Sequence, residues 1–140
     1  MESNASEPEE ITDFVEVPSL ISAFKCGFDQ KYYSEDMEYI MIPGKFLKHV
    51  TEPYVIKASG DSMSPTILDG DTLIVDRQAK YKHRDIIVCR LNDQFLVKQF
   101  VVNNFSTFLK SENNDFEIRK IMPDDEFEVL GKVISILRDI

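Results

Sequence analysis

The sequence predicts a mostly β domain that follows a flexible N-terminal arm. Short runs rich in Val, Ile, Phe and Tyr begin at Tyr39 and recur towards the C-terminus, as half-buried strands require. Turn-forming residues separate these runs, and no long stretch has the 3.6-residue apolar period of a helix. Residues 1–26 carry six acidic residues and one lysine, so they hold five of the nine net negative charges. We therefore expect an acidic arm over residues 1–26 and one domain over residues 27–140.

The arm divides into a polar start and a short apolar stretch. The first ten residues are polar and are expected to be disordered. Apolar residues between positions 20 and 24 then precede Cys26-Gly27. We interpret residues 1–30 as a mobile arm with one apolar stretch. The alternative is a frayed terminus that docks loosely on the domain.

The predicted strands are the β-branched and aromatic runs between turns. They lie at residues 39–42, 54–58, 72–76, 85–91, 95–102, 107–110, 116–120 and 127–137. The turns between them contain Pro43-Gly44, Asp69-Gly70-Asp71, Asn92-Asp93 and Asn113-Asn114-Asp115, residue types that favour chain reversal. Residues 44–50 and 64–68 could each form a helical turn.

Composition excludes several classes of protein. A net charge of −9 disfavours direct binding to phosphate backbones, so any work near DNA would need a protein partner. No apolar run approaches the roughly 20 residues that span a bilayer, and the N-terminus lacks the features of a signal peptide. Cys26 and Cys89 alone cannot build a zinc site or a disulfide framework, so we expect a cytoplasmic protein without a metal or other cofactor.

A candidate nucleophile follows the strand predicted at residues 54–58. The chain continues as Ser59-Gly60-Asp61-Ser62-Met63, and a Pro-led turn and an Asp-Gly turn lead into the next strand. A serine that leaves a strand soon after a glycine can be held exposed beside backbone N–H groups, which can form an oxyanion hole. The alternative is a plain polar turn, because Ser, Gly and Asp are common in turns.

A candidate base lies on the return strand of a predicted hairpin. Strand alternation places Lys98 on one face with Leu96 and Phe100, so its side chain lies on or beside an apolar surface. Such a lysine usually extends its ammonium group into water. If the ammonium is instead buried near a serine, burial favours the neutral form.

Serine and lysine together suggest nucleophilic catalysis. A serine hydroxyl is a weak nucleophile that needs an adjacent base, and neutral lysine can act as one. Lowering the pKa of a lysine from ~10.4 to ~7 costs about 4 to 5 kcal/mol, which the fold must supply. We therefore expect slow cleavage that accelerates at high pH. His49 and His83 lack the context of a catalytic triad, and the Asp69-Gly70-Asp71 turn lacks calcium-loop spacing.

Several pieces of sequence in one fixed order carry a family resemblance. They are Cys26-Gly27-Phe28, Lys57-Ala58-Ser59-Gly60-Asp61-Ser62-Met63, Asp69-Gly70-Asp71, Leu73-Ile74-Val75-Asp76, Asp85-Ile86-Ile87-Val88, Val97-Lys98 and Leu130-Gly131-Lys132-Val133-Ile134. Ser62 and Lys98 are 36 positions apart. The chain thereby resembles the LexA/UmuD family of self-cleaving serine peptidases, and most closely its UmuD-like members. The resemblance implies the family's peptidase fold of twisted antiparallel sheets.

The resemblance also implies an autoproteolytic mechanism. Ser62 would attack the carbonyl of Cys26, and neutral Lys98 would take the serine proton and return it to the leaving amine of Gly27. The backbone amides of Ser62 and Met63 would be the oxyanion donors. Gly27 suits the position after the cut, because the absence of a Cβ lets the backbone pass close to the serine.

The implied biology is the bacterial SOS response to DNA damage. Family members are homodimers that cleave slowly until they meet a RecA filament on single-stranded DNA. In UmuD-like members the shortened product joins a UmuC-type Y-family polymerase to form an error-prone translesion enzyme. LexA-type members carry an N-terminal helix-turn-helix, for which residues 1–26 are too few.

Some residues depart from the family pattern, and other functions stay open. Gln99 replaces a basic residue, Arg84 replaces a glycine, and residues 29–37 lack prolines that relatives place after the cut. One rival is a signal-peptidase-like enzyme, which shares the serine–lysine chemistry but usually has a membrane anchor. The other is a catalytically silent β-rich module that binds a polymerase or acts as an antirepressor.

Overall fold

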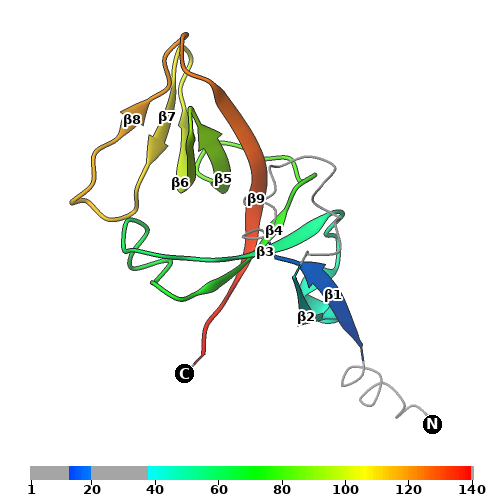
Figure 1. Ribbon diagram of the computed structural model, residues 1–140. Coiled ribbons are helices and arrows are strands. Elements are labelled where there is room, and N and C mark those ends of the chain that lie inside the picture. The colour runs from blue at the N-terminus through cyan, green and yellow to red at the C-terminus, as the bar shows by residue number, and fades with distance from the viewer. Residues whose placement is uncertain (1–12, 20–37, 140) are drawn as a thin grey trace.

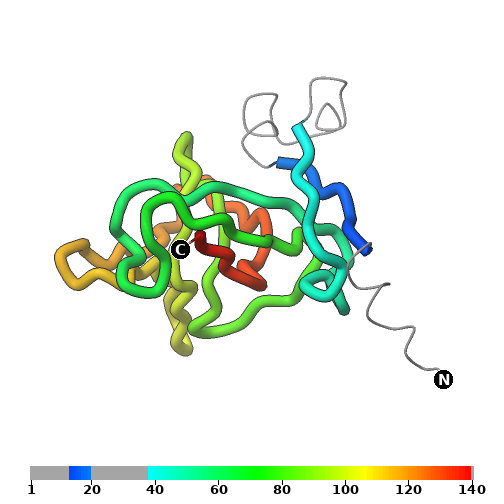
Figure 2. Tube along the Cα trace, turned by 90° about the horizontal axis from the view of Figure 1, so that it is seen from below, coloured from blue at the N-terminus to red at the C-terminus, as the bar shows by residue number. Residues whose placement is uncertain are grey.

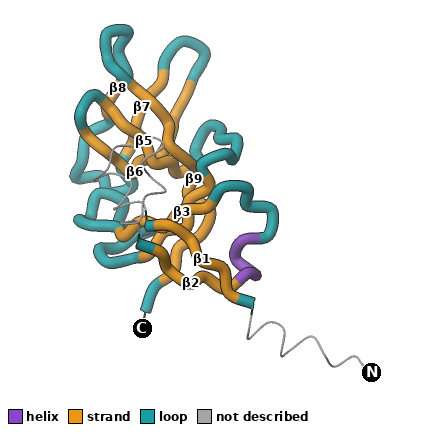
Figure 3. Tube along the Cα trace, turned by 45° about the vertical axis from the view of Figure 1, so that its right-hand side comes forward, coloured by secondary structure: helices purple, strands orange, loops and turns teal. Residues whose placement is uncertain are grey.

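The computed structural model describes residues 13–19 and 38–139, and this part of the chain is mostly β (Figure 1). The strands are β1 (Phe14–Pro18), β2 (Tyr39–Pro43), β3 (Pro53–Lys57), β4 (Thr72–Asp76), β5 (Ile86–Leu91), β6 (Gln94–Val102), β7 (Thr107–Lys110), β8 (Arg119–Lys120) and β9 (Phe127–Leu137). A 3₁₀ helix, η3 (Gly44–Leu47), follows β2 and is drawn in purple in Figure 3. The mostly β fold class predicted from the sequence is confirmed.

The strands form two antiparallel sheets. The larger has the order β3-β4-β9-β5-β6-β7-β8, and the smaller pairs β1 with β2. Strand β9 is the longest, and it pairs with β4 along its C-terminal part and with β5 along its N-terminal part. The long red strand in Figure 1 therefore joins the two ends of the molecule. Figure 2 shows β1 and β2 at the end opposite the β7–β8 region.

Glycine is required where β9 passes β4. A Cβ atom on Gly131 would lie 2.5 Å from Cγ1 of Val75 and 3.1 Å from the carbonyl oxygen of Asp76. Overpacking of this kind costs about 1 to 3 kcal/mol. Gly131 therefore lets one strand complete the ladders of both of its neighbours.

Alternation on β5 separates two apolar clusters. Val88 packs in a cluster with Tyr54, Met63, Ile67, Leu73, Val75 and Leu130. On the opposite face, Ile87, Cys89 and Leu91 pack with Leu109, and Leu96 and Phe100 of β6 cover them. Candidate site residues attach to both clusters, because Met63 belongs to the first and Lys98 shares the strand face of Leu96 and Phe100.

One predicted strand is mostly a turn. Only Arg119–Lys120 of the run predicted at residues 116–120 pairs as a strand. Phe116 closes a turn through its N–H, which donates to the carbonyl of Asn113, and both Phe116 and Ile118 are exposed. Apolar composition suggested a pleated surface here, but these side chains have no core to face.

The expectation of a mobile arm does not hold at β1. Phe14–Pro18 pairs antiparallel with β2, and Val17 is fully buried. Ser19 then forms a parallel bridge to Val55 of β3. Residues 1–12 and 20–37 lie outside the described residues. The strand that orders β1 lies 21 to 29 positions further along the chain, so local composition could not reveal it.

Arg84 occupies a backbone conformation that suits glycine. Its φ angle is +81°, and its N–H donates to the carbonyl of Phe100 at 2.7 Å. A left-handed backbone costs a residue with a side chain roughly 1 to 2 kcal/mol. This explains why glycine is the residue expected there from the family resemblance.

Candidate active site

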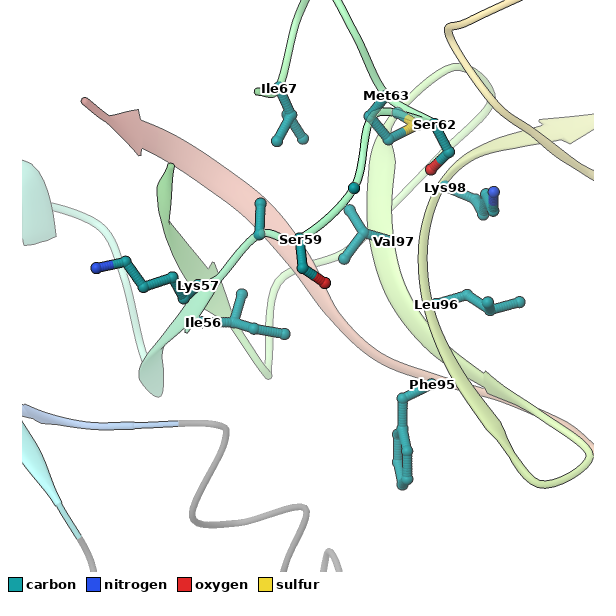
Figure 4. Close-up of a pocket in the computed structure, with 12 residues that line it drawn as sticks. Ile56, Lys57, Ser59, Ser62, Met63, Ile67, Phe95, Leu96, Val97 and Lys98 are labelled. Carbon is teal, nitrogen blue, oxygen red and sulfur yellow. The ribbon is translucent and has the colours of Figure 1, made fainter. Parts of the chain in front are cut away.

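A cleft of about 600 Å³ lies between the end of β3 with its following loop and strand β6. Its walls combine apolar residues with two serines and two lysines. The lining residues are Ile56, Lys57, Ala58, Ser59, Gly60, Ser62, Met63, Ile67, Phe95, Leu96, Val97 and Lys98. Figure 4 shows Ser62 and Lys98 as neighbours at one end of this cleft, away from Lys57 and Phe95. The structure thus brings together the two side chains that the sequence marks as nucleophile and base.

The loop that carries Ser62 is anchored on both sides of the serine. Met63 is buried in the apolar cluster, and its carbonyl accepts the N–H of Ile67 at 2.8 Å. Before the serine, Gly60 has a φ of +85°, a conformation that glycine adopts without strain. The N–H of Gly60 donates to Oδ1 of Asp69 at 2.9 Å. These anchors leave Ser62 half-buried at the wall of the cleft.

The turn after the serine loop has a structural role that the sequence did not reveal. Asp71 is buried, and its carboxylate accepts two hydrogen bonds of 2.7 Å from the guanidinium of Arg138. It also accepts the N–H of Leu68 at 2.7 Å. The hydrogen bond from Arg138 is the main reason that the pKa of Asp71 is lowered to about 2. This ion pair fastens the serine loop to the C-terminal end of β9.

Lys98 lies in a partly dry environment. It is half-buried opposite Ile87 in the β5–β6 ladder, and its Nζ lies 5.7 Å from the centre of the Phe116 ring. Burial lowers the pKa of Lys98, while the nearby Cys89 acts in the opposite direction. Its Nζ donates a hydrogen bond of 2.7 Å to Oγ of Ser111, which is buried. In the described part of the chain, the hydrogen-bond partner of this amine is therefore a neutral hydroxyl.

The segment between β7 and β8 contacts both halves of the site. Besides Ser111, it contains Asn113, whose main-chain N–H donates to the carbonyl of Ser62 at 2.9 Å. The side-chain Nδ2 of Asn113 donates to the carbonyl of Asp61 at 3.1 Å. Sequence reasoning took this segment only as a turn, because Ser and Asn there are ordinary turn residues and no pattern links them to the site.

Other residues singled out in the sequence lie apart from the cleft. His83 accepts the N–H of Val102 through Nδ1, and His49 is exposed after η3. Cys89 is a buried core residue, and burial raises the pKa of its thiol to about 12. Cys26 and Gly27 lie outside the described residues.

Within residues 13–19 and 38–139, no cluster of three or more His, Cys, Asp or Glu side chains could hold a metal ion. The helical content of the same residues includes no segment with the length and apolar character needed to cross a membrane.

Comparison with known proteins identifies the family. The model of the family described as Peptidase S24-like matches residues 19–134, which is most of the chain and includes the whole cleft. The chain belongs to the peptidase S24-like family. The prediction of a self-cleaving peptidase of the LexA/UmuD type is thereby confirmed at the level of the family, and peptidase activity is supported in that broad sense.

The curated proteins to which this chain is similar include repressors and a shorter protein. A LexA repressor of Clostridium perfringens is 33% identical over 105 residues, which are 74% of this chain and 49% of the relative. Protein MucA of Salmonella typhimurium is 29% identical over 119 residues, which are 84% of this chain and 81% of the relative. The chain thus spans about half the length of the LexA repressors it matches and most of MucA.

Proposed function

We propose that the protein is an autoproteolytic serine peptidase that cuts its own Cys26–Gly27 bond with a Ser62–Lys98 dyad. The observation that carries the proposal is that Ser62 and Lys98 line one cleft, with the lysine on a strand face that burial keeps partly dry. Membership of a peptidase family supports the same reaction type.

In the proposed reaction, neutral Lys98 takes the proton of the Ser62 hydroxyl as its oxygen bonds to the carbonyl carbon of Cys26. The C–N bond to Gly27 then breaks, and the protonated lysine gives its proton to the departing amine. Water, activated by the same lysine, hydrolyses the resulting ester and releases Ser62. The lowered pKa of Lys98 supports this role, because a base must be uncharged to accept a proton.

Two main-chain amides are the proposed oxyanion donors. Among residues 13–19 and 38–139, no hydrogen bond uses the N–H of Ser62 or Met63. Both amides belong to the loop that is anchored by Met63, so they are held in place before the reaction starts. Such preorganised donors are worth about 2.7 to 4 kcal/mol each in a serine peptidase.

The position of Ser19 supports cleavage within one chain. Ser19 bridges to Val55 in parallel, and Cys26 lies seven positions after Ser19 just as Ser62 lies seven positions after Val55. Seven residues span at most about 25 Å when fully extended. The segment from Val55 to Ser62 includes the Gly60 turn and is not fully extended, so the chain after Ser19 is long enough to reach its own serine.

The wider role is part of the same proposal. The relatives include LexA repressors and MucA, and we propose the SOS response to DNA damage in the cytoplasm as the setting. The acidic arm is residues 1–26 and the peptidase domain residues 27–140. The partners are a second copy of the chain, a RecA filament on single-stranded DNA that stimulates cleavage, and a UmuC-type polymerase that receives the shortened product.

The test is self-cleavage of the purified chain. Incubation at alkaline pH, followed by intact-mass measurement, is expected to yield a fragment that starts at Gly27. Ser62→Ala and Lys98→Ala should each slow cleavage by at least about 10²-fold, the lower range for loss of an acid–base group. Lys120→Ala, which changes an exposed lysine of β8, is the matched control and should cleave normally.

A dilution series separates the two routes of cleavage. If the chain cuts itself, the first-order rate is independent of protein concentration. A rate that grows with concentration would assign the cut to a partner molecule. Undiminished cleavage in both Ser62→Ala and Lys98→Ala would refute the dyad. Absence of cleavage in the parent chain would favour the silent binding module.

A further inference from the structure

The segment from Ser111 to Phe116, here called the bridging segment, bonds to both residues of the proposed dyad. At one end, Oγ of Ser111 accepts a hydrogen bond from Nζ of Lys98 at 2.7 Å. Two positions later, Asn113 bonds to the carbonyls of Ser62 and Asp61 through its main chain and its side chain. One short segment therefore contacts the amine of the base and the backbone of the nucleophile.

This link matters because no strand ladder sets the distance between the two catalytic groups. Ser62 follows β3, and Lys98 belongs to β6. In the sheet order, β4, β9 and β5 lie between those two strands. Small changes in the twist of the three intervening strands would therefore change the distance between the two side chains of the dyad. The bridging segment instead connects the two residues directly through a few hydrogen bonds.

We propose that the bridging segment positions the dyad, with Ser111 orienting the amine of Lys98 and Asn113 fixing the loop that carries Ser62. This inference rests on the proposed serine–lysine cleavage, and it assigns positioning roles to two residues outside the dyad.

The proposed role of Ser111 follows from the hydrogen-bond donors and acceptors of an uncharged amine. Neutral lysine has two N–H groups and one lone pair, and the lone pair must face the Ser62 proton. When one N–H is held by Ser111, rotation about the terminal bond is restricted and the lone pair keeps its direction. Ser111 is only 2% exposed, so water has little access to take its place.

Ser111 also acts on the charge of the lysine. Its oxygen accepts from the ammonium form, and a hydrogen bond to the charged form favours that form. The bond therefore opposes part of the effect of burial. Removal of the hydroxyl should leave an amine that is more often neutral but whose lone pair is misoriented. This combination of effects distinguishes a positioning role from a loss of folding.

The experiment is a pH–rate profile of self-cleavage for Ser111→Ala. The plateau rate should fall about 10- to 100-fold, as misplacement of a reacting group does, while the midpoint moves to lower pH. Ser111→Thr, which keeps the hydroxyl, should recover most of the rate. Ser135→Ala, at a half-buried serine of β9, is the matched control and should leave both plateau and midpoint unchanged.

Asn113→Ala tests the other end of the bridging segment. It removes the side-chain bond to Asp61 and retains the main-chain bond to Ser62. The plateau should fall by about tenfold or less with no change in midpoint, because Asn113 does not bond to the amine. If Ser111→Ala fails to fold, this variant and Ser111→Thr still test the proposal.

The outcomes are distinct from those that test the dyad. If Ser62→Ala and Lys98→Ala stop cleavage while Ser111→Ala cleaves with the parental plateau and midpoint, the positioning role is wrong and the dyad stands. NMR titration of Lys98 in the uncleavable Ser62→Ala chain gives a second reading. An unchanged titration midpoint on adding Ser111→Ala would also overturn the role of Ser111.

Discussion

Asp71 and Lys98 are ionisable residues in two neighbouring regions, and the groups that surround them favour opposite charge states. Asp71 lies in the turn after the serine loop, where its carboxylate accepts hydrogen bonds from the guanidinium of Arg138 and from a main-chain amide. Lys98 lies on β6, where its amine donates a hydrogen bond to the neutral hydroxyl of Ser111. The pKa of each residue is lowered, but this stabilises the charged form of Asp71 and destabilises the charged form of Lys98.

The difference distinguishes an ion pair that stabilises the fold from the residue proposed as the catalytic base. A buried charge with a matched partner fixes a turn, because protonation would break its bonds. Partial burial of the Lys98 amine instead shifts its protonation equilibrium towards the neutral form. Asp71 follows the loop that carries Ser62, so its ion pair with Arg138 anchors the loop of the proposed nucleophile.

The largest expected effect that sharpens this comparison is the pH dependence of self-cleavage. Because the base must be neutral, the rate should rise about tenfold per pH unit below the pKa of Lys98 and level off above it. Burial lowers that pKa, so levelling should begin below ~10.4, the value for an unperturbed lysine. Timed mass spectrometry across alkaline pH measures the profile. A rate that is flat from neutral to alkaline pH would contradict the assignment of Lys98 as base.

A smaller effect is expected from Asp71→Asn, which removes the charge with little change of shape. The pKa of Asp71 is about 2 in the folded chain and ~3.9 in an unfolded one, so its charge stabilises the fold fully above pH ~4. That contribution is lost as the pH falls towards about 2. Urea unfolding should therefore show a deficit for the variant at neutral pH that shrinks in acid.

Asp93→Asn, in the exposed turn between β5 and β6, is the control and should match the parent at every pH. A deficit of Asp71→Asn that stays constant down to pH ~2 would mean that packing, rather than charge, carries the role of Asp71.

The smallest expected effect concerns the exclusion of water from the strand face beside Lys98. Cys89 is fully buried there, and the pKa of its thiol is raised to about 12 by burial. Because the thiolate is the reactive form, Cys89 should resist iodoacetamide in the native chain at neutral pH and react in urea. Peptide mapping identifies the labelled site. Rapid labelling of Cys89 in the native chain would show that water reaches this face. It would thereby contradict the burial to which the lowered pKa of Lys98 is attributed.

Much of the fold was predictable because strand patterns are local. The strand at Thr72–Asp76 and the long final strand at Phe127–Leu137 have the predicted bounds, since apolar runs between turn residues specify them directly. β1 was missed because its five residues owe their order to pairing with β2. Phe116 was wrongly assigned to a strand. The sequence does not distinguish an apolar side chain that packs in a sheet from one that lies beside the amine of Lys98.

The sequence by itself determined the alternating strands, the serine after Gly60 and the lysine on an apolar strand face, because each depends on neighbours in the chain. Only the tertiary structure decided that Lys98 meets Ser111, that Asn113 meets Ser62, and that Asp71 meets Arg138. These contacts join residues 13, 51 and 67 positions apart, and they depend on strand order and crossing. A local pattern carries no information about which distant partner will complete a buried polar group.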